Sequence, residues 1–346
     1  MTDTLGVLEA LRTAPEQVSD AHVTTARALR DATLPDPEGI GSVAVLGMGG
    51  SGVVGDVLAA VAADVCPVPV VVSKQHRAPA HLGPRTLAVA VSYSGTTGET
   101  LAQAEAAVAA GASLVTIASD GPLAALGAAN GVHLPVAPGA PGPRFALGPM
   151  VVPAVALLDR LGLLPGGHAA LVAAEAQLRA RRDACVPELV APANPARELA
   201  RRIGLTWPVV YGAGPVGAAA ALRWKQSFNE NAKAPSFWNA YPELDHNEVC
   251  GWGQHGDVTR QVLTLVELVH DGSDPWVDAR VAATRDLVEE CVAQILTVHA
   301  VGDGALAQLL DLTYLGDWVS TYLALDHDVD PGPIAAITAL KRAVGG

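Results

Sequence analysis

The stretch that decides the fold is Ser42-Val43-Ala44-Val45-Leu46-Gly47-Met48-Gly49-Gly50-Ser51-Gly52. Its apolar run Val43–Leu46 predicts a buried strand, and a glycine-rich turn follows at once. The next segment, Val53–Ala62, is rich in Ala and Val and has helical length. Strand, glycine turn and helix in this order are typical of a βαβ unit on a parallel sheet.

The same alternation continues through the first half of the chain. Short runs rich in Val and Ile predict strands at Val43–Leu46, Val68–Ser73, Leu87–Ser92, Leu114–Ala118 and Val132–Val136. Ala-rich segments between them predict helices at Val53–Ala62, Glu99–Ala110 and Pro122–Ala129. The first four of these strands run into a glycine or a hydroxyl residue, so ligand binding is expected at the carboxyl edge of this sheet.

A loop rich in Pro and Gly, residues 138–143, and the breakers at Leu164-Pro165-Gly166-Gly167 separate the two halves. The second half repeats the scheme, with strands predicted at Pro208–Tyr211, Val262–Val269 and Leu296–Val301. One further helix is predicted before this boundary, at Pro149–Leu161, and the helices predicted after it are His168–Asp183, Pro215–Asn231, Pro275–Ala293 and Ala305–Leu325. We expect an α/β protein with domains at 1–165 and 166–346, each a doubly wound, flavodoxin-like parallel sheet flanked by helices.

Composition excludes several classes of protein. Half of the 346 residues are hydrophobic, and 22 basic against 35 acidic residues give a net charge of −13. This argues against disorder and against a nucleic-acid or membrane partner. The N-terminus lacks the pattern of a signal peptide, and the dispersed cysteines do not resemble a disulfide framework, so a cytoplasmic protein is expected. These cysteines are Cys66, Cys185, Cys250 and Cys291.

The turn Gly47–Gly52 fits the G-x-G-x-x-G pattern of dinucleotide-binding folds. That function requires an acidic residue about 20 positions further on, at the end of the next strand. The next predicted strand instead ends at Ser73-Lys74, so the acidic residue is missing. Lys74 could in principle bind the 2′-phosphate of a phosphorylated dinucleotide. A nicotinamide-dependent oxidoreductase is therefore the less favoured interpretation.

The third predicted strand runs into Ser92-Tyr93-Ser94-Gly95-Thr96-Thr97-Gly98-Glu99-Thr100, which holds five hydroxyls besides that of Tyr93. Helix capping alone needs one hydroxyl residue, whereas this loop has five. Hydroxyl donors and free N–H groups at a helix N-terminus suit a phosphate monoester. Together with Ser51 of the neighbouring turn, the loop is predicted to converge on one anion.

Six motifs occur in order along the chain: GMGGSG (47–52), SYSGTTGET (92–100), PRFALG (143–148), NENAK (229–233), PELDHNEVCGW (242–252) and ALKRAVGG (339–346). In these the sequence resembles the bifunctional phosphoglucose/phosphomannose isomerases of the sugar-isomerase (SIS) superfamily. The resemblance implies two SIS domains. Thr96 and Gly98 stand where the family pattern has Asn and Glu, a difference that bears on specificity.

The resemblance implies a role for individual residues. Glu230 is similar to the base that moves a proton between C1 and C2, and Arg144 to the arginine that stabilises the enediolate. His246, contributed by the partner subunit of a homodimer, and Lys341 resemble the ring-opening groups. The residues that resemble the phosphate cradle are Gly50, Ser51, Ser92, Ser94 and Thr97.

The implied reaction is the interconversion of glucose 6-phosphate, and of mannose 6-phosphate, with fructose 6-phosphate, and it needs neither a metal nor another cofactor. Acid–base groups, a carboxylate and a cation are the types that such a reaction requires. The main alternative is a non-catalytic sugar-phosphate sensor. Each residue also has a plainer interpretation: Glu230, His246 and Lys341 as solvated surface groups, and Arg144 as a loop anchor. A metal site is the weakest alternative, on His246, Glu248, Cys250 and His255.

Overall fold

The computed structural model describes residues 2–344 and divides into two compact units. The N-terminal unit comprises Thr13–Glu175, and the C-terminal unit comprises residues 2–12 and 176–344. Helix α7 (Gly167–Cys185) runs from the first unit into the second. Within residues 2–344, none of the helices combines the length and the apolar character needed to span a bilayer.

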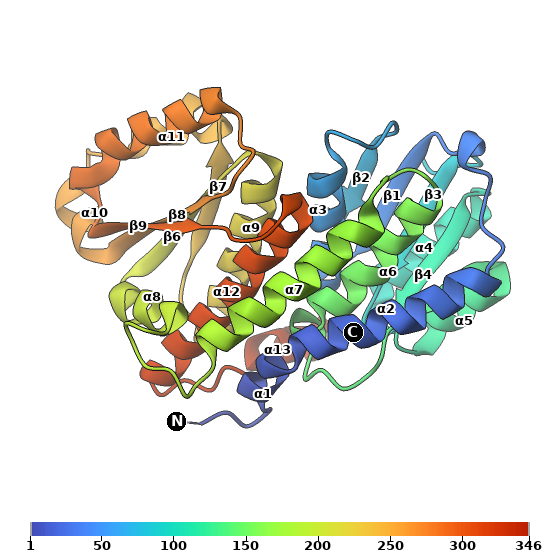
Figure 1. Cartoon of the computed structure of the whole chain (residues 1–346), viewed down its shortest axis with the longest axis horizontal. Helices are drawn as coiled ribbons and strands as arrows, with labels where there is room; N and C mark the ends of the chain where they lie inside the picture. The colour runs from blue at the N-terminus through green and yellow to red at the C-terminus, as the bar shows by residue number, and fades with distance from the viewer. Residues whose placement is uncertain (1, 345–346) are drawn as a thin grey trace. The chain divides into compact units, whose positions relative to one another are not determined.

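The N-terminal unit is built on a parallel sheet of five strands in the order β2-β1-β3-β4-β5 (Figure 1). Every residue of β3 is buried, as expected for a parallel sheet that is covered on both faces. The sequence thus predicted the fold class correctly. The strands are β1 (Ser42–Gly47), β2 (Val70–Ser73), β3 (Thr86–Val91), β4 (Ser113–Ala118) and β5 (Gly131–Pro135).

Five helices pack on this sheet or on each other. Gly55 lets one of them approach closely, because a Cβ there would lie 2.6 Å from Cγ1 of Val72. Pairs of these helices also contact one another away from the sheet, so that small Ala and Val side chains fill the core in place of the scarce aromatics. The helices are α2 (Ala14–Asp31), α3 (Gly49–Ala62), α4 (Gly98–Ala109), α5 (Gly121–Asn130) and α6 (Leu147–Arg160).

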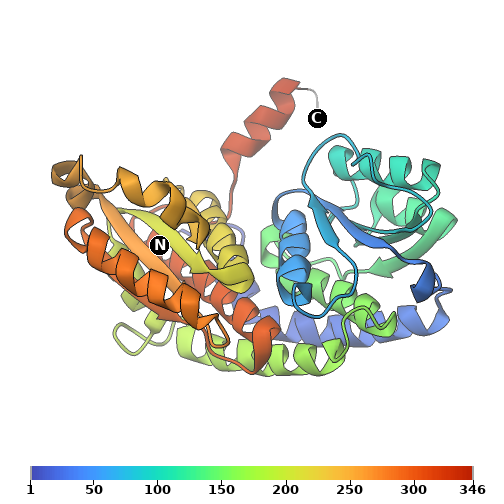
Figure 2. The ribbon, with the colours of Figure 1, turned by 90° about the horizontal axis from the view of Figure 1, so that it is seen from above.

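The C-terminal unit holds a four-stranded parallel sheet in the order β7-β6-β8-β9. Its strands are β6 (Trp207–Ala213), β7 (Phe237–Tyr241), β8 (Leu263–Val269) and β9 (Gln294–His299). Its further helices are α1 (Val7–Arg12), α8 (Pro195–Ile203), α9 (Gly214–Ser227), α10 (Gly256–Val262), α11 (Pro275–Val288), α12 (Gly304–Asp326) and α13 (Ala335–Val344). Figure 2 shows α13 projecting from the rest of this unit, and all of its residues are exposed.

Several predicted boundaries were wrong. The helix predicted over Pro215–Asn231 ends at Ser227 and continues as a π-helical turn, η3 (Phe228–Ala232). The helix predicted over Pro275–Ala293 ends at Val288, because the chain then turns through a 3₁₀ segment into the extended Val292. Strand β7 and helices α1, α2, α8, α10 and α13 had no counterpart in the sequence-based prediction.

Candidate active site

The glycine turn lies at the end of β1, beside the end of β3, where Gly47 is in register with Val91. These two strands form the switch point of the sheet, the usual ligand-binding edge of such folds. Gly49 has φ of +53°, and a Cβ on Gly50 would lie 2.9 Å from the backbone N of Arg144. Gly50 thus allows the short turn η2 (Pro143–Phe145) to lie directly against the start of α3.

Arg144 is buried, with 4% of its surface exposed. Its guanidinium lies over the ring of Phe145, 4.4 Å from the ring centroid. This stacking fixes the side chain and so agrees with the plainer interpretation as a loop anchor. The backbone of Arg144 lies against Gly50 of the glycine turn.

The hydroxyl loop and the glycine turn are joined by a direct bond. The backbone N–H of Tyr93 donates to Oγ of Ser51 at 3.1 Å, and this hydroxyl donates in turn to the sulfur of Met150. Ser92 and Thr97 share a hydrogen bond of 2.9 Å across the loop. In such a pair one hydroxyl donates and the other still has its own hydrogen to give.

The tip of the loop is formed by Ser94 and Thr96, both exposed, whose hydroxyls lie 2.9 Å apart. Gly95 between them has φ of +68°, and a Cβ there would lie 1.6 Å from the carbonyl oxygen of Asp120. The Gly95 carbonyl also accepts from the N–H of Leu123 at 3.0 Å. The tip is therefore braced by the loop that follows β4, and only glycine fits at its centre.

Both loops lead into helices whose first turn presents backbone N–H groups. Neither Met48 nor Thr97 uses its side chain to cap α3 or α4. Hydroxyls and helix N-termini at one sheet edge form a set of neutral donors that suits an anion with several oxygens. Lys74, which was predicted as a possible partner of a 2′-phosphate, is ion-paired with Asp56 of α3.

In the C-terminal unit, Glu230 lies in the π-helical turn that continues α9. Such turns cost stability relative to a regular helix and are frequent at functional sites. The preceding helix is held to α12 by a buried ion pair, in which Nη2 of Arg223 lies 2.7 Å from Oδ1 of Asp317. Ser227 donates to the same carboxylate oxygen at 2.7 Å.

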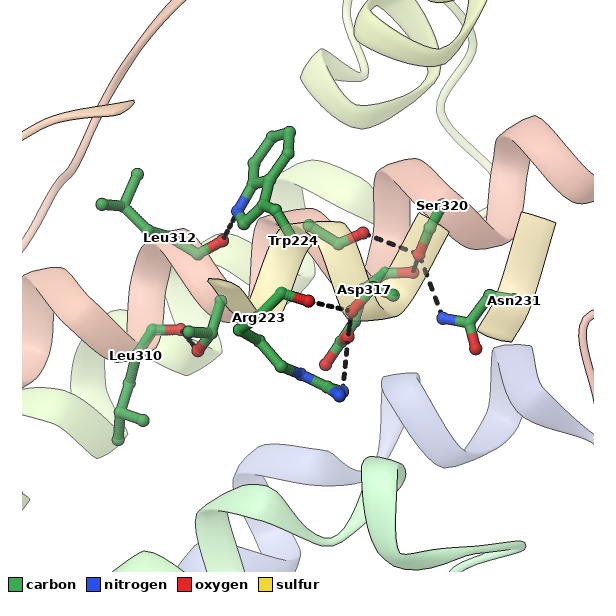
Figure 3. Close-up of polar contacts among 10 residues, drawn as sticks. Arg223, Trp224, Asn231, Leu310, Leu312, Asp317 and Ser320 are labelled. Carbon is green, nitrogen blue, oxygen red and sulfur yellow. Dashed lines mark hydrogen bonds and ion pairs between the residues drawn. The ribbon is translucent and has the colours of Figure 1, made fainter. Parts of the chain in front are cut away.

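Figure 3 shows the side chains that hold this turn against α12. Asn231 donates to Oγ of Ser320 at 3.0 Å, and the indole N–H of Trp224 donates to the carbonyl of Leu312 at 2.6 Å. Asn231, Ser320 and Trp224 are fully buried. The residues on either side of Glu230 are thus fixed to a rigid helix, while Glu230 itself is half-buried.

Glu230 lines a cavity of about 490 Å³ together with the segment that leads into α13. Lys233 lines the same cavity, and its ammonium donates to the carbonyl of Glu230 at 2.8 Å. The remaining lining residues are Asn229, Val329, Asp330, Pro333, Ile334, Ala335, Ala336 and Ile337. Six of the ten lining residues are apolar, so Glu230 and Lys233 are among the few polar groups of this cavity.

His246 ends a 3₁₀ turn, η4 (Glu243–His246), and is exposed. The residues around it are anchored. Asp245 accepts from the hydroxyl of Thr284 at 2.7 Å, and Glu248 accepts from the hydroxyl of Tyr211. Burial, followed by the contact with Glu248, raises the pKa of Tyr211, so this phenol remains a hydrogen-bond donor. The motif 242–252 thus presents one imidazole from a fixed loop.

Lys341 lies on α13 and is exposed. The structure brings Glu230 together with the start of this helix, and it brings Ser51, Ser92 and Thr97 together in the N-terminal unit. Lys341 and His246 are outside the set of described residues that line the Glu230 cavity. Within residues 2–344, His, Cys, Asp and Glu do not gather in threes that could hold a metal ion.

Sequence reasoning missed the π-helical turn and the buried polar network beneath it. No spacing rule predicts that turn, and the hydrogen bond from Asn231 to Ser320 joins residues that are 89 positions apart in the chain. Lys233 is part of the motif NENAK, but it was given no role of its own. Its positive φ, +55°, could not be read from the sequence.

Comparisons with known proteins cover both units. The family model described as "SIS domain" matches residues 40–156, and the model "Bacterial phospho-glucose isomerase C-terminal SIS domain" matches residues 192–344. The chain is 32% identical to a bifunctional phosphoglucose/phosphomannose isomerase of Caldicellulosiruptor bescii over 97% of this chain and 98% of that protein. A protein of the same name from Aquifex aeolicus is 31% identical over 86% of this chain and 88% of its own length.

Solved structures share the fold at lower identity. The C-terminal domain of glucosamine-fructose-6-phosphate aminotransferase from Francisella tularensis superposes with a TM-score of 0.71 at 14% identity, covering 96% of this chain and 99% of that one. A glucose-6-phosphate isomerase like protein from Thermus thermophilus gives a TM-score of 0.59 at 22% identity, covering 99% and 96%.

Proposed function

Because this chain belongs to the bifunctional phosphoglucose/phosphomannose isomerase family, we propose that it interconverts glucose 6-phosphate, and also mannose 6-phosphate, with fructose 6-phosphate. It is an isomerase of the sugar-phosphate class, which the relatives favour over a non-catalytic sensor. The observation that carries the proposal is the direct bond between the glycine turn and the hydroxyl loop, from the N–H of Tyr93 to Ser51. That bond makes one donor-rich edge out of two motifs 42 residues apart.

In this proposal the phosphate is held by Gly50, Ser51, Ser92, Ser94 and Thr97. The hydroxyl pairs support this role, since each pair has one hydrogen left to donate to an oxygen of the substrate. Residues 1–165 thus bind the phosphate, while residues 166–346 carry the candidate Glu, His and Lys.

The proposed chemistry begins with ring opening by His246 and Lys341. One group protonates the ring oxygen while the other takes the proton from the C1 hydroxyl. Glu230 then accepts the proton from C2 and returns it to C1, while the hydroxyl proton of O2 passes to O1, and Arg144 stabilises the negative charge that develops on oxygen. Donors aimed at such a charge contribute about 3 kcal/mol elsewhere. Both the fixed backbone around Glu230 and its apolar cavity support its assignment as the base.

A coupled assay tests the function. We expect turnover of glucose 6-phosphate and mannose 6-phosphate, measured side by side, and loss of at least about a hundredfold in kcat for Glu230→Gln. Lys225→Gln, on the preceding helix, serves as a matched control on a residue with no assigned role. If Glu230→Gln turned over as fast as the wild type, Glu230 would not be the base. If the wild-type protein showed no turnover, the proposed reaction would be wrong.

The proposal also includes a homodimer in which His246 of each chain acts in the active site of the partner subunit. The enzyme is proposed to work in the cytoplasm. Mixing His246→Ala chains with Glu230→Gln chains should restore activity, because one of the two sites in each hybrid would then have both groups intact. Subunit exchange is verified with differently tagged chains. An inactive hybrid after complete exchange would show that His246 acts within its own chain.

A further inference from the structure

Lys233 occupies an unusual place in the C-terminal unit. It follows the π-helical turn that carries Glu230 and adopts the left-handed conformation, with φ of +55°. Glycine or asparagine is the usual choice at such a position, because the Cβ of most other residues lies too close to the following carbonyl oxygen. This chain has a lysine at this position, although it contains only four lysines in all.

The side-chain ammonium of Lys233 donates to three carbonyl oxygens. Two of them belong to the turn itself, Glu230 at 2.8 Å and Asn231 at 3.3 Å. The third belongs to Pro331, at 3.2 Å and 98 residues away in sequence. The first two bonds are ordinary helix C-capping, whereas the bond to Pro331 joins the turn to another segment of the unit.

The segment that receives this third bond is itself fixed. Asp330 accepts from the hydroxyl of Thr4 at 2.5 Å and from the backbone N–H of Gly332 at 3.0 Å. Although burial opposes it, these bonds and the nearby Lys233 ammonium lower the pKa of the Asp330 carboxyl. The carboxylate of Asp330 thus holds the chain on either side of Pro331, which is buried.

We propose that Lys233 is a positioning residue, which holds the backbone of Glu230 at a fixed distance from the segment leading into α13. Glu230 and the segment leading into α13 line the same cavity. In this proposal the Lys233 ammonium therefore sets the distance between these two sides of the cavity. The inference deepens the proposed function and rests on the assignment of Glu230 as the base.

Removal of the ammonium is therefore expected to change proton transfer more than substrate binding. A reacting group displaced by about 1 Å can cost as much as a hundredfold in rate. For Lys233→Ala we expect kcat to fall by about tenfold or more, with KM changed by less than about threefold, since the phosphate cradle is untouched. The rate at which solvent deuterium enters the sugar phosphate should fall with kcat, because this exchange reports the proton transfer itself.

The matched control is Lys225→Ala, which removes the same charge from α9. Ethylammonium provides a second test, since Lys233 is exposed and a small amine can reach the gap left by its side chain. We expect ethylammonium to raise kcat of Lys233→Ala severalfold and to leave Lys225→Ala unchanged. A purely structural lysine would shift the unfolding midpoint and would show no such rescue.

The outcomes separate the two levels of the argument. A Lys233→Ala protein with kcat within twofold of wild type, alongside an inactive Glu230→Gln protein, overturns the positioning role and leaves the proposed function intact. A wild-type protein without turnover overturns both. If Lys233→Ala does not fold, Lys233→Arg decides the question. Its planar donors cannot reach three converging carbonyls, so an unchanged kcat overturns the proposal and a loss of about threefold or more supports it.

Discussion

The ion pair between Arg223 and Asp317 offers the sharpest test of how the C-terminal unit is held together. Its two side chains are 1% and 8% exposed, and Nη2 and Oδ1 lie 2.7 Å apart. The same carboxylate oxygen also accepts from Ser227. Replacing Asp317 by Leu deprives a buried guanidinium and a buried hydroxyl of their common acceptor at once.

Removing one partner of a buried pair typically costs about 3–5 kcal/mol, because the remaining charge is left in a poorly solvated place. Removing both partners costs far less, since no buried charge is then left behind. We therefore expect Asp317→Leu to lose about 3–5 kcal/mol and the double variant Arg223→Met/Asp317→Leu to recover at least half of that loss. The exposed pair of Arg201 and Glu198 is the control, and Glu198→Gln should leave the free energy of unfolding nearly unchanged, because exposed ion pairs contribute little.

Tryptophan fluorescence during urea unfolding measures the loss of stability in the C-terminal unit, where Arg223 and Asp317 lie. All six tryptophans of the chain belong to the C-terminal unit, and Trp224 and Trp318 are fully buried there. The reasoning would be refuted by a loss below about 1.5 kcal/mol for Asp317→Leu, or by a double variant less stable than the single one. Either result would mean that packing rather than charge pairing joins α9 to α12.

Three further predictions concern other parts of the chain. Gly95→Ala should destabilise the hydroxyl loop by about 2 kcal/mol or more and raise KM for the sugar phosphate, because its Cβ would collide with the carbonyl of Asp120; steady-state kinetics and urea unfolding check this. Thr284→Val should cost about 1–3 kcal/mol in urea unfolding, since the buried Asp245 loses a donor, and Thr284→Ser should restore most of it. Burial, opposed by Glu175, lowers the pKa of His22 below its ordinary value of 6.5. Between these two pKa values the unfolded chain binds a proton that the folded chain does not, so stability should fall as the pH drops below about 6.5, and less so in His22→Gln, as followed by circular dichroism.

The central strands of the two sheets could be predicted because nearly all of their residues are buried, on both faces of the sheet. Runs such as Val43–Leu46 and Leu87–Ser92 carry few polar side chains, so that the pattern is simple and its boundaries differ from the observed ones by a residue or two. Strand β7 has the opposite character. It lies at the edge of its sheet with Phe237 and Trp238 exposed, and its short sequence shows neither a buried run nor a clear alternation.

The candidate site was predictable at the level of residue types but not of geometry. Five hydroxyls in nine residues identified the loop, and its bond to the glycine turn followed from the neighbouring positions of β1 and β3. The setting of Glu230 did not follow, because it depends on contacts of Asn231 and Lys233 with residues 89 and 98 positions away. A helical pattern continues smoothly through this region, so the switch to a π-helical turn is a tertiary effect.

In the proposed function, the net charge of −13 poses a problem that the neutral donors of the N-terminal unit, together with Arg144, would resolve. A dianionic phosphate is repelled by an acidic chain, but at physiological ionic strength charges further than about 8 Å away are largely screened. Affinity then depends on the nearest groups, here the paired hydroxyls, the N–H groups of two helix starts and the Arg144 beside Gly50. Oriented dipoles of this kind need no excess of basic residues, so overall composition carries no sign of them. Their signature is local, in hydroxyls and glycines placed where two adjacent strands end.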